Sequence, residues 1–513
     1  MLPENQGNTH HTGSDHSLRC AQSWLLACTR GQKTSSALPT RVVHIKGSQD
    51  VRLYQSKREV KKYVCLSHCW GGVEIIRTKN ATLTQYEKGI PWEDLSLTFQ
   101  EAITFAFRLG YEYIWIDSLC IIQDNVEDWR LEGSRMSQIY TGAALTLAAT
   151  ASSDGSGGCF RRHERPALTH VSYPAADGSK MRLGVRLGVE NTNWHGARLP
   201  LLGRAWAFQE RLLSHRVLHF LEEELLWECR HNTSFELFAQ GNNVWEHEIR
   251  HSTSSFKSIL SLDKIGIVQK WQEIICQYSA LQLTEEDDIF PALQGIGKYM
   301  SEYIRSNYLA GLWEIDLIEG LLWYTTSHIR PLKWRSTSWS WASMLGPVTW
   351  DSIAWDRFLF TPYTSLVSTQ IEPVDSDTFG ALKSGRITLR GRCFNDVDEG
   401  VFCTTPTEHT GNVMYMSGST WMYKEVRYIQ DCKVFDGVRP HSKPLVPGQR
   451  VKTLLMGDTG SGWTYHFLVL RPVTMAENTY ERFAYMMLGP WDFAPGGPRS
   501  LCALGEEEII HII

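Results

Sequence analysis

The segment that decides the fold opens with YVCLSHCWGG (63–72), continues with YIWIDSLCIIQD (113–124) and closes with AALTLAAT (143–150). Each stretch contains a short apolar run, and helix-like periodicity separates one run from the next. Strand, helix, strand, helix, strand is the order of right-handed βαβ units in a parallel sheet. The pattern therefore predicts an α/β domain with a mostly parallel, flavodoxin-like sheet and flanking helices.

Two helices are predicted between these strands. The first covers 96–109, where Thr98 and Glu101 have the spacing of a capping box and Gly110 supplies the C-terminal glycine. The second covers 129–142 and leads into the third strand. Both helices have the length that a βαβ crossover requires.

The second helix carries a carboxylate on an otherwise apolar stripe. Offsets of 0, 3, 7 and 11 fall on one side of a helix at roughly 100° per residue, and they are occupied by Trp129, Glu132, Met136 and Tyr140. A carboxylate on an inward face is paired or lines a site. Glu132 is therefore the candidate catalytic residue, because a fixed carboxylate can hold a ribose hydroxyl or stabilise an oxocarbenium-like transition state. The alternative is an ion pair with Arg135 or Arg108.

Further polar side chains follow the predicted strands. The carboxyl ends of parallel strands meet at one edge of the sheet, where α/β proteins bind ligands. At this edge and in the helix beyond it, the candidate ligand-binding residues are Ser67, Trp70, Asp117, Cys120, Gln123 and Trp129. Asp117 has a second interpretation, as the capping residue of the turn that follows it.

The cysteines of this segment are predicted to be buried free thiols. His68 precedes Cys69, but adjacent strand residues face opposite ways, so the imidazole does not readily activate that thiol. Cys120 lies in an apolar run and is expected to be buried as well. Cys65, His68 and Cys69 lack a second ligand pair at zinc-like spacing, so no metal site is predicted.

The composition excludes several classes of partner. The chain has 51 Lys+Arg against 56 Asp+Glu, a net charge of −5, and no basic run, so neither nucleic acid nor a membrane surface is expected as a partner. Twelve Cys in 513 residues are too dilute for a disulfide scaffold. The N-terminus lacks the layout of a signal peptide, and apolar runs stay far below the roughly 18 residues of a membrane helix. A cytoplasmic protein is the prediction.

Tryptophan is unusually frequent. The 20 Trp outnumber the 19 Tyr, which indicates aromatic packing in the core. Trp115, Trp129 and Trp206 are expected to be largely buried.

The rest of the chain falls into segments of different character. Residues 1–40 are polar and are predicted to be a poorly ordered leader with one short helix. RVLHF to LLWEC (216–229) is predicted to be a β-hairpin outside the parallel sheet. Residues 231–335 are predicted to be mainly helical, and 336–513 to be β-rich because short alternating segments recur between Gly and Pro.

RAWAFQERLL (204–213) is predicted to form a helix. Its Glu210 and Arg211 are expected to serve in an inter-domain ion pair rather than in catalysis.

Several of these blocks together resemble the HET (heterokaryon incompatibility) domain family of filamentous fungi. The matching blocks occur in the family's order across about 41–230, with weaker matches beyond, in YSALQLTEEDDIF, STSWSWASMLGPV and YERFAY. They are YVCLSHCWGG, LGYEYIWIDSLCIIQDNVEDW, RLEGSRMSQIYTGAALTLAATAS, GRAWAFQERLLSHRVLHF and LLWEC. One departure is His68 before Cys69, where many relatives carry an aromatic or another residue.

The resemblance implies a role in fungal non-self recognition, in which incompatible fusion triggers programmed cell death. HET domains are thought to be remotely related to TIR domains, some of which cleave NAD with a glutamate three residues after a Trp. Trp129 and Glu132 have that spacing, so the resemblance implies a TIR-like cleft with Glu132 as the catalytic carboxylate.

Three hypotheses about function follow. The first is an effector with NAD glycohydrolase-like activity, for which NAD is a substrate and no cofactor is expected. The second is a non-catalytic recognition and scaffold module that signals by association with a protein partner of an incompatibility system or with itself. The third is an enzyme that acts on a small metabolite in the same cleft.

Overall fold

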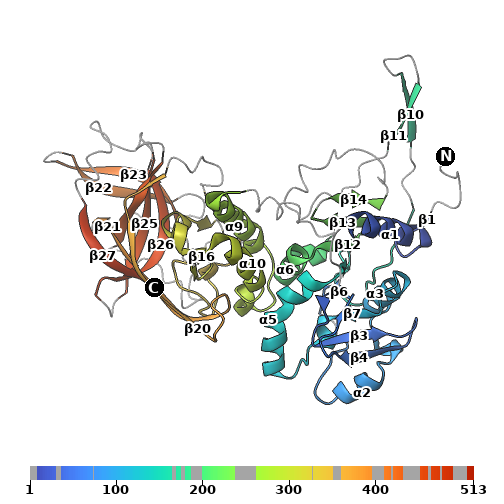
Figure 1. The fold of residues 1–513 in the computed structure, drawn as a ribbon. Coiled ribbons are helices and arrows are strands. Elements are labelled where there is room, and N and C mark those ends of the chain that lie inside the picture. The colour runs from blue at the N-terminus through green and yellow to red at the C-terminus, as the bar shows by residue number, and fades with distance from the viewer. Residues whose placement is uncertain are drawn as a thin grey trace. The chain divides into compact units, whose positions relative to one another are not determined.

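The chain forms two compact units in the computed structural model, Met1–Ser261 and Leu262–Ile513 (Figure 1). Each unit contains a large sheet of its own. The structure describes residues 9–29, 36–72, 74–164, 169–174, 180–185, 199–230, 232–236, 262–325, 327, 329–350, 360–394, 409–417, 420–430, 451–459, 464–473, 477–488 and 505–513.

An eight-stranded sheet forms the centre of the first unit, in the order β14-β13-β12-β8-β6-β7-β3-β4. Its strands are β3 (Arg41–Ile45), β4 (Val51–Gln55), β6 (Val64–Ser67), β7 (Tyr113–Trp115), β8 (Leu145–Ala148), β12 (Arg216–Phe220), β13 (Leu225–Cys229) and β14 (Thr233–Phe235). The four central strands β12, β8, β6 and β7 are parallel, which confirms the βαβ pattern of 63–150.

The outer strands make the sheet mixed, which corrects the prediction of a mostly parallel sheet. β3 pairs antiparallel with both β4 and β7, and β13 pairs antiparallel with both β12 and β14. The links between β3 and β4 and between β12 and β13 are short, and short links permit only antiparallel pairing.

The hairpin at 216–229 lies inside this sheet, and the prediction that it lies outside was wrong. β12 pairs in parallel with β8, and β13 continues the sheet beyond it. Every residue of both strands is buried. Both faces of the hairpin are therefore covered by other parts of the protein, as is usual for strands inside a sheet.

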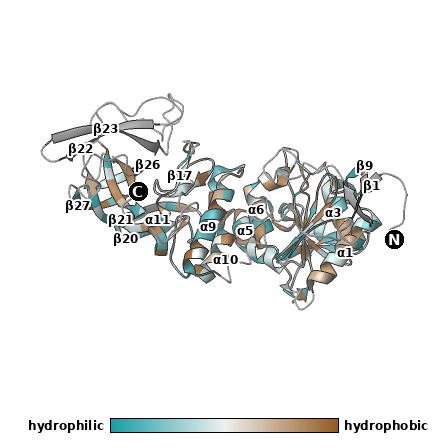
Figure 2. Cartoon of the chain, turned by 90° about the horizontal axis from the view of Figure 1, so that it is seen from above, coloured by the Kyte–Doolittle hydropathy of each residue, from teal (hydrophilic) through white to brown (hydrophobic). Residues whose placement is uncertain are grey.

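Helices cover both faces of the central strands (Figure 1). α3 (Leu97–Arg108) lies on one side, while α5 (Val126–Gly142) and α6 (Ala205–Leu213) pack against each other on the opposite side. Apolar residues concentrate along the strands between these helices (Figure 2). The shorter helices of this unit are α2 (Leu83–Lys88), η1 (Trp92–Asp94), α4 (Asp117–Cys120) and η2 (Pro200–Gly203).

Helix α3 begins two residues earlier than its predicted capping box implies. The Ser96 hydroxyl accepts a hydrogen bond from the Phe99 amide at 3.4 Å, which makes Ser96 the N-cap. Thr98 instead donates to the Gly155 carbonyl at 3.0 Å. The prediction at the C-terminal end is confirmed, because Gly110 has a φ of +87° and ends the helix in a left-handed conformation.

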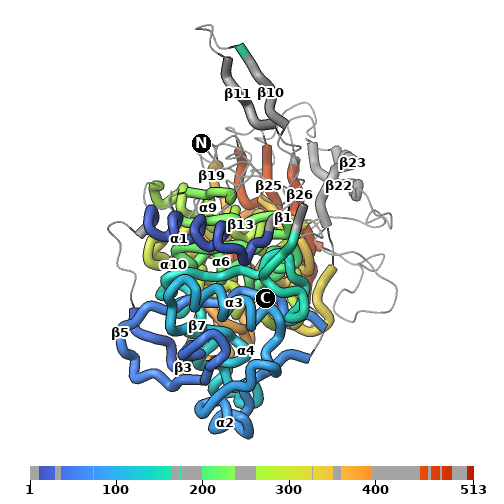
Figure 3. The backbone as a smooth tube through the Cα atoms, turned by 90° about the vertical axis from the view of Figure 1, so that its right-hand side faces the viewer, coloured from blue at the N-terminus to red at the C-terminus, as the bar shows by residue number. Residues whose placement is uncertain are grey.

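The leader contains one long helix, α1 (Asp15–Thr29), which packs on β13 (Figure 3). The rings of Trp24 and Trp227 stack with their centroids 6.1 Å apart. The Ser17 hydroxyl donates to the Glu236 carboxylate at 2.8 Å. Residues close to the start of the chain therefore cover the sheet edge formed by β13 and β14.

The second unit combines helices with a nine-stranded sheet, as the sequence predicted for the described part of 262–513. Its helices are α9 (Lys264–Ser279), η5 (Glu286–Ile289), α10 (Gln294–Ile304), η6 (Glu314–Asp316), α11 (Leu317–Gly320) and η7 (Trp341–Ser343). Its large sheet contains β19 (Phe360–Pro362), β20 (Ser365–Pro373), β21 (Leu382–Phe394), β22 (His409–Ser417), β23 (Thr420–Gln430), β24 (Lys452–Thr459), β25 (Thr464–Pro472), β26 (Thr479–Leu488) and β27 (Glu506–Ile512). The helical prediction for 237–261 lies outside the described residues.

Small two-stranded sheets complete the description. They pair β1 (Thr9–His11) with β9 (Arg162–Glu164), β2 (Ser36–Ala37) with β5 (Val60–Lys61), β10 (Thr169–Pro174) with β11 (Lys180–Val185), β15 (Tyr308–Leu309) with β16 (Leu312–Trp313), and β17 (Tyr324–Thr325) with β18 (Val348–Thr349). A bilayer-spanning helix needs about 20 apolar residues, and no helix within the described ranges meets that requirement.

Tryptophans form much of the core of the second unit. The indole N–H groups of Trp271 and Trp341 both donate to the carbonyl of Gly311, at 2.9 and 3.0 Å. Gly311 has a φ of +92°, and a Cβ there would lie 2.4 Å from Trp341. Six Trp of this unit are almost fully buried: Trp271, Trp313, Trp323, Trp339, Trp341 and Trp350. The expectation of aromatic core packing is therefore confirmed.

The three tryptophans singled out in the first unit differ in burial. Trp115 is fully buried, as expected, and Trp206 is partly buried. Trp129 is 39% exposed, so its predicted burial was wrong. It lies in the first turn of α5, where the stripe that it shares with Glu132 extends past the neighbouring elements.

Substitution by alanine should destabilise the protein more at Trp115 than at Trp129. Trp115→Ala should lower the free energy of unfolding by roughly 3–5 kcal/mol, because it removes a large buried ring and leaves a cavity. Trp129→Ala should cost about 1 kcal/mol or less, as expected for a half-exposed helical position. Chemical denaturation of the full chain measures both, and equal losses would contradict the assignment.

Candidate functional site

The parallel strands meet at a point where the chain reverses its winding direction. From β6 the chain passes to β7 on one side, and it returns to β8 on the other side of β6. The crossovers from β6 and β8 therefore leave on opposite faces, and α/β proteins bind ligands in the crevice at such a point. Ser67 ends β6 at this position, and Ala148 ends β8.

The buried carboxyl group of Glu210, on α6, lies beside this point. The Ser67 hydroxyl donates a short hydrogen bond to Glu210 Oε2. Glu210 is only 6% exposed, and burial raises the pKa of its carboxyl to about 7, with a further contribution from the charge of Asp117. Glu210 therefore changes its protonation state near neutral pH.

A second carboxylate, Asp117, lies at the end of the neighbouring strand. It accepts hydrogen bonds from the Trp70 indole N–H at 2.8 Å and from the Ser118 amide at 2.7 Å. The His68 Nδ1 atom lies 3.8 Å from Asp117 Oδ1. Ser67, Trp70 and Asp117 are thus brought together at one edge, as the sequence analysis expected.

His68 is the buried imidazole of this polar cluster. Burial lowers the pKa of its ring and outweighs the opposing effect of Asp117. Its Nε2 atom is buried and has no hydrogen-bond partner among the described residues. The Arg204 guanidinium donates to the His68 carbonyl at 3.1 Å and adds a positive charge beside the cluster.

The cluster has the chemistry of a general acid–base site. Glu210 is a proton donor or acceptor near pH 7, and the cluster also contains the Ser67 hydroxyl, the Asp117 carboxylate and the His68 imidazole. A strongly shifted pKa combined with specific partners at a strand edge is typical of functional sites.

The cavity beside this cluster is very small. It has a volume of about 10 Å³, close to what one water molecule needs. Its lining includes Ser67, Ala148, Arg211 and His219. This cavity is therefore too small to hold a nucleotide.

Glu132 lies elsewhere, at the start of β3. It is 1% exposed, so its predicted inward orientation is confirmed. Its Oε1 atom accepts hydrogen bonds from Thr40 Oγ1 at 2.8 Å and from Arg135 Nη1 at 3.0 Å. The alternative of an ion pair with Arg135 is thus what the structure contains.

The remaining predicted site residues have different surroundings. Cys120 is fully buried, and burial raises the pKa of its thiol to about 12, so it is a protonated structural thiol. Cys69 is also buried, within an apolar cluster that includes Val217. Gln123 donates to the Asp117 carbonyl at 3.2 Å and holds the turn after α4. The Trp129 side chain is partly exposed.

Glu210, His68 and Arg204 complete the cluster and were missed as site residues. Glu210 was assigned to an inter-domain ion pair, but its partner Ser67 belongs to the same unit. The available signal was the spacing of Ala207, Glu210 and Leu213, which places a carboxylate on the apolar stripe of the helix.

The neighbouring ion pair of α6 is structural. Arg211 donates to both oxygens of Glu228, at 2.7 and 3.0 Å, and His219 Nε2 lies 3.1 Å from the same carboxylate. Burial alone would raise the pKa of Glu228, but Arg211 and His219 hold it well below its ordinary value. This pairing lies within the first unit, which corrects the inter-domain expectation.

The fold and cluster define the class of protein: an α/β domain with a buried acid–base cluster at the point where the connections between its parallel strands change side. Residues 63–210 match the family model described as Heterokaryon incompatibility protein (HET), so this segment is similar to HET domains. This match confirms the resemblance and supports a general role in heterokaryon incompatibility. No curated protein and no solved structure matches the chain.

The shifted Glu210 carboxyl should make stability depend on pH. Its pKa rises from an ordinary value of 4.5 to about 7 on folding. The stabilisation from the protonated form is therefore complete below pH 4.5 and is lost as the pH rises through 7. The unfolding free energy of the wild type minus that of Glu210→Gln should fall by about 3 kcal/mol across this window.

Taking the difference between the two proteins removes the contribution of the buried histidines to the pH dependence, because these histidines are present in both. Denaturant titrations of the full chain at several pH values measure it. Glu74→Gln, which changes an exposed carboxylate, is the matched control and should show no such trend. A difference for Glu210→Gln that stays flat from pH 4.5 to 7 would contradict the assignment.

Proposed function

We propose that the chain acts in fungal non-self recognition and that its effector step is hydrolysis of the N-glycosidic bond of NAD or a related nucleotide. The observation that carries the proposal is Glu210, a buried carboxyl with a pKa raised to about 7. It lies beside Ser67, at the point where the connections between the parallel strands change side.

This carboxyl suits the proposed chemistry. Breaking the bond between C1′ and nitrogen leaves positive charge on the ribose and releases neutral nicotinamide from NAD. A fixed carboxylate in a water-poor site stabilises that charge. Water then attacks C1′, and its proton passes to the carboxylate, which a pKa near neutrality permits.

The other groups of the cluster supply binding functions. Arg204 offers a positive charge to a phosphate, and Asp117 offers a carboxylate to a ribose hydroxyl. The strand order β7-β6-β8-β12 supports the flavodoxin-like and TIR-like expectation for the binding edge. The substrate requires displacement of the residues that now close the cavity.

Glu132 is the second candidate for the acting carboxylate. It is buried near the start of β3, but Arg135 already neutralises it. A carboxylate held by a guanidinium is a weaker charge stabiliser and a poorer base. Glu210 therefore leads on geometry.

A non-catalytic recognition and scaffold function is the alternative, and the small cavity favours it. A volume of about 10 Å³ beside Ser67 admits no nucleotide. In that case the domain signals by association, with a protein partner of the incompatibility system or with a second copy. Both hypotheses place the protein in the cytoplasm.

Paired variants test the proposal. Glu210→Gln keeps the shape of the side chain and should abolish nicotinamide release from NAD and toxicity in the fungus, while the protein remains folded. Glu132→Gln should lower the melting temperature because it breaks the ion pair with Arg135, and its remaining activity should follow the folded fraction.

The two readouts distinguish the alternatives. No nicotinamide release by the folded wild type, with full toxicity from Glu210→Gln, would establish the scaffold hypothesis. Loss of turnover in a stable Glu132→Gln with normal turnover in Glu210→Gln would assign catalysis to Glu132 instead.

A further inference from the structure

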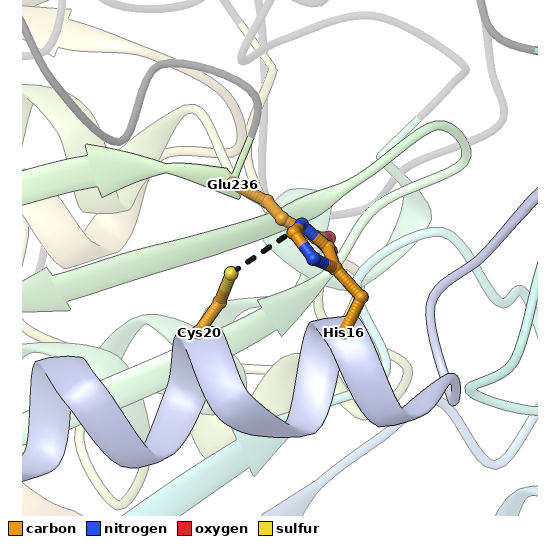
Figure 4. A group of neighbouring side chains, drawn as sticks. All are labelled: His16, Cys20 and Glu236. Carbon is orange, nitrogen blue, oxygen red and sulfur yellow. Dashed lines mark hydrogen bonds and ion pairs between the residues drawn. The ribbon is translucent and has the colours of Figure 1, made fainter. Parts of the chain in front are cut away.

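Three side chains of types that commonly bind metal ions lie close together where α1 meets the end of β14. His16 and Cys20 are four residues apart and lie on one face of α1. Glu236 directly follows β14, more than 200 positions further along the chain. Figure 4 shows both helix side chains on the side of α1 that faces Glu236.

The distances between the three groups fit a single ion. Cys20 Sγ lies 3.6 Å from His16 Nε2, and His16 Nε2 lies 3.8 Å from Glu236 Oε1. One ligand atom from each residue lies within 4.8 Å of the other two. Bonds of about 2.0–2.3 Å in a tetrahedral zinc site place ligand atoms roughly 3.3–3.8 Å apart.

The carboxylate is held in place by its surroundings. The Glu236 side chain is fully buried. Its Oε1 atom accepts from the Ser17 hydroxyl at 2.8 Å, and its Oε2 atom accepts from the Leu225 amide at 3.1 Å. Such contacts orient a metal ligand.

The donor set and its exposure indicate the kind of ion. A thiolate and an imidazole favour zinc, whereas calcium and magnesium prefer oxygen ligands alone. The His16 side chain is 51% exposed, so the position has access to solvent. Three protein ligands with solvent access leave a fourth position for water, as in open zinc sites.

We propose that His16, Cys20 and Glu236 bind a zinc ion with water as the fourth ligand. The ion fastens α1 to the sheet edge, because its ligands come from both. Binding converts the Cys20 thiol to a thiolate and releases its proton to solvent, so zinc affinity falls as the pH is lowered. The site is independent of the proposed nucleotide cleavage.

Metal analysis of the untagged full chain tests the site. After treatment with a chelator and dialysis against zinc, the wild type should hold one zinc per chain. Cys20→Ser and His16→Ala should lose it, and Glu236→Gln should bind more weakly. Cys28→Ser, a cysteine of the same helix, is the matched control and should retain the metal.

Two further measurements separate this site from adventitious binding. Cobalt(II) in place of zinc should give a thiolate-to-metal absorption band in the wild type and Cys28→Ser but not in Cys20→Ser. Zinc should raise the melting temperature of the same two proteins only. No stoichiometric zinc in the wild type, or full retention by Cys20→Ser and His16→Ala, would overturn the proposal.

Discussion

Burial of an acid without a directly bound cation is the constraint on which the first unit depends. Glu210 is a buried residue of α6, and it accepts a hydrogen bond from the Ser67 hydroxyl. Burying a charge in this way costs several kcal/mol, so the group keeps its proton to a higher pH. The hydrogen bond to Ser67 fixes one turn of α6 over β6, and Ser214, 2.7 Å from Thr146, fixes its end over β8. The packing of α6 on the sheet and the protonation of Glu210 therefore depend on each other.

Two adjacent residues of α6 show how partners decide the role of a buried charge. Arg211 lies against Glu228 and forms two parallel hydrogen bonds with it, so that carboxylate stays ionised and holds β13 to the helix. Among the described residues no guanidinium forms a hydrogen bond with Glu210, and its pKa rises to about 7 instead. A paired charge stabilises the fold, whereas an unpaired one is available for chemistry. Glu132, bound to Arg135, belongs with the paired group.

The sequence predicted those parts of the fold that depend on residues close together in the chain. The three apolar runs gave the parallel strands, and the polar residues after them gave Ser67, Trp70 and Asp117 at one edge. The place of β12 beside β8 was not predictable, because it depends on contacts between residues about 70 positions apart. Ser96 and Thr98 both suit a helix start, and the sequence does not distinguish them. Spacing alone places Glu210 on the apolar stripe of its helix, but only the packing of α6 against β6 shows that its partner is the Ser67 hydroxyl.

The position of α1 has a consequence for the nascent chain. Ser17 bonds to Glu236, 219 residues later, and Trp24 stacks on Trp227. Translation at about 5–20 residues per second separates the emergence of these partners from the ribosome by roughly 10–40 s. During that interval the face of α1 that packs on β13 has no sheet to cover. The first unit therefore cannot complete its folding vectorially, and its earliest helix is among the last elements to dock.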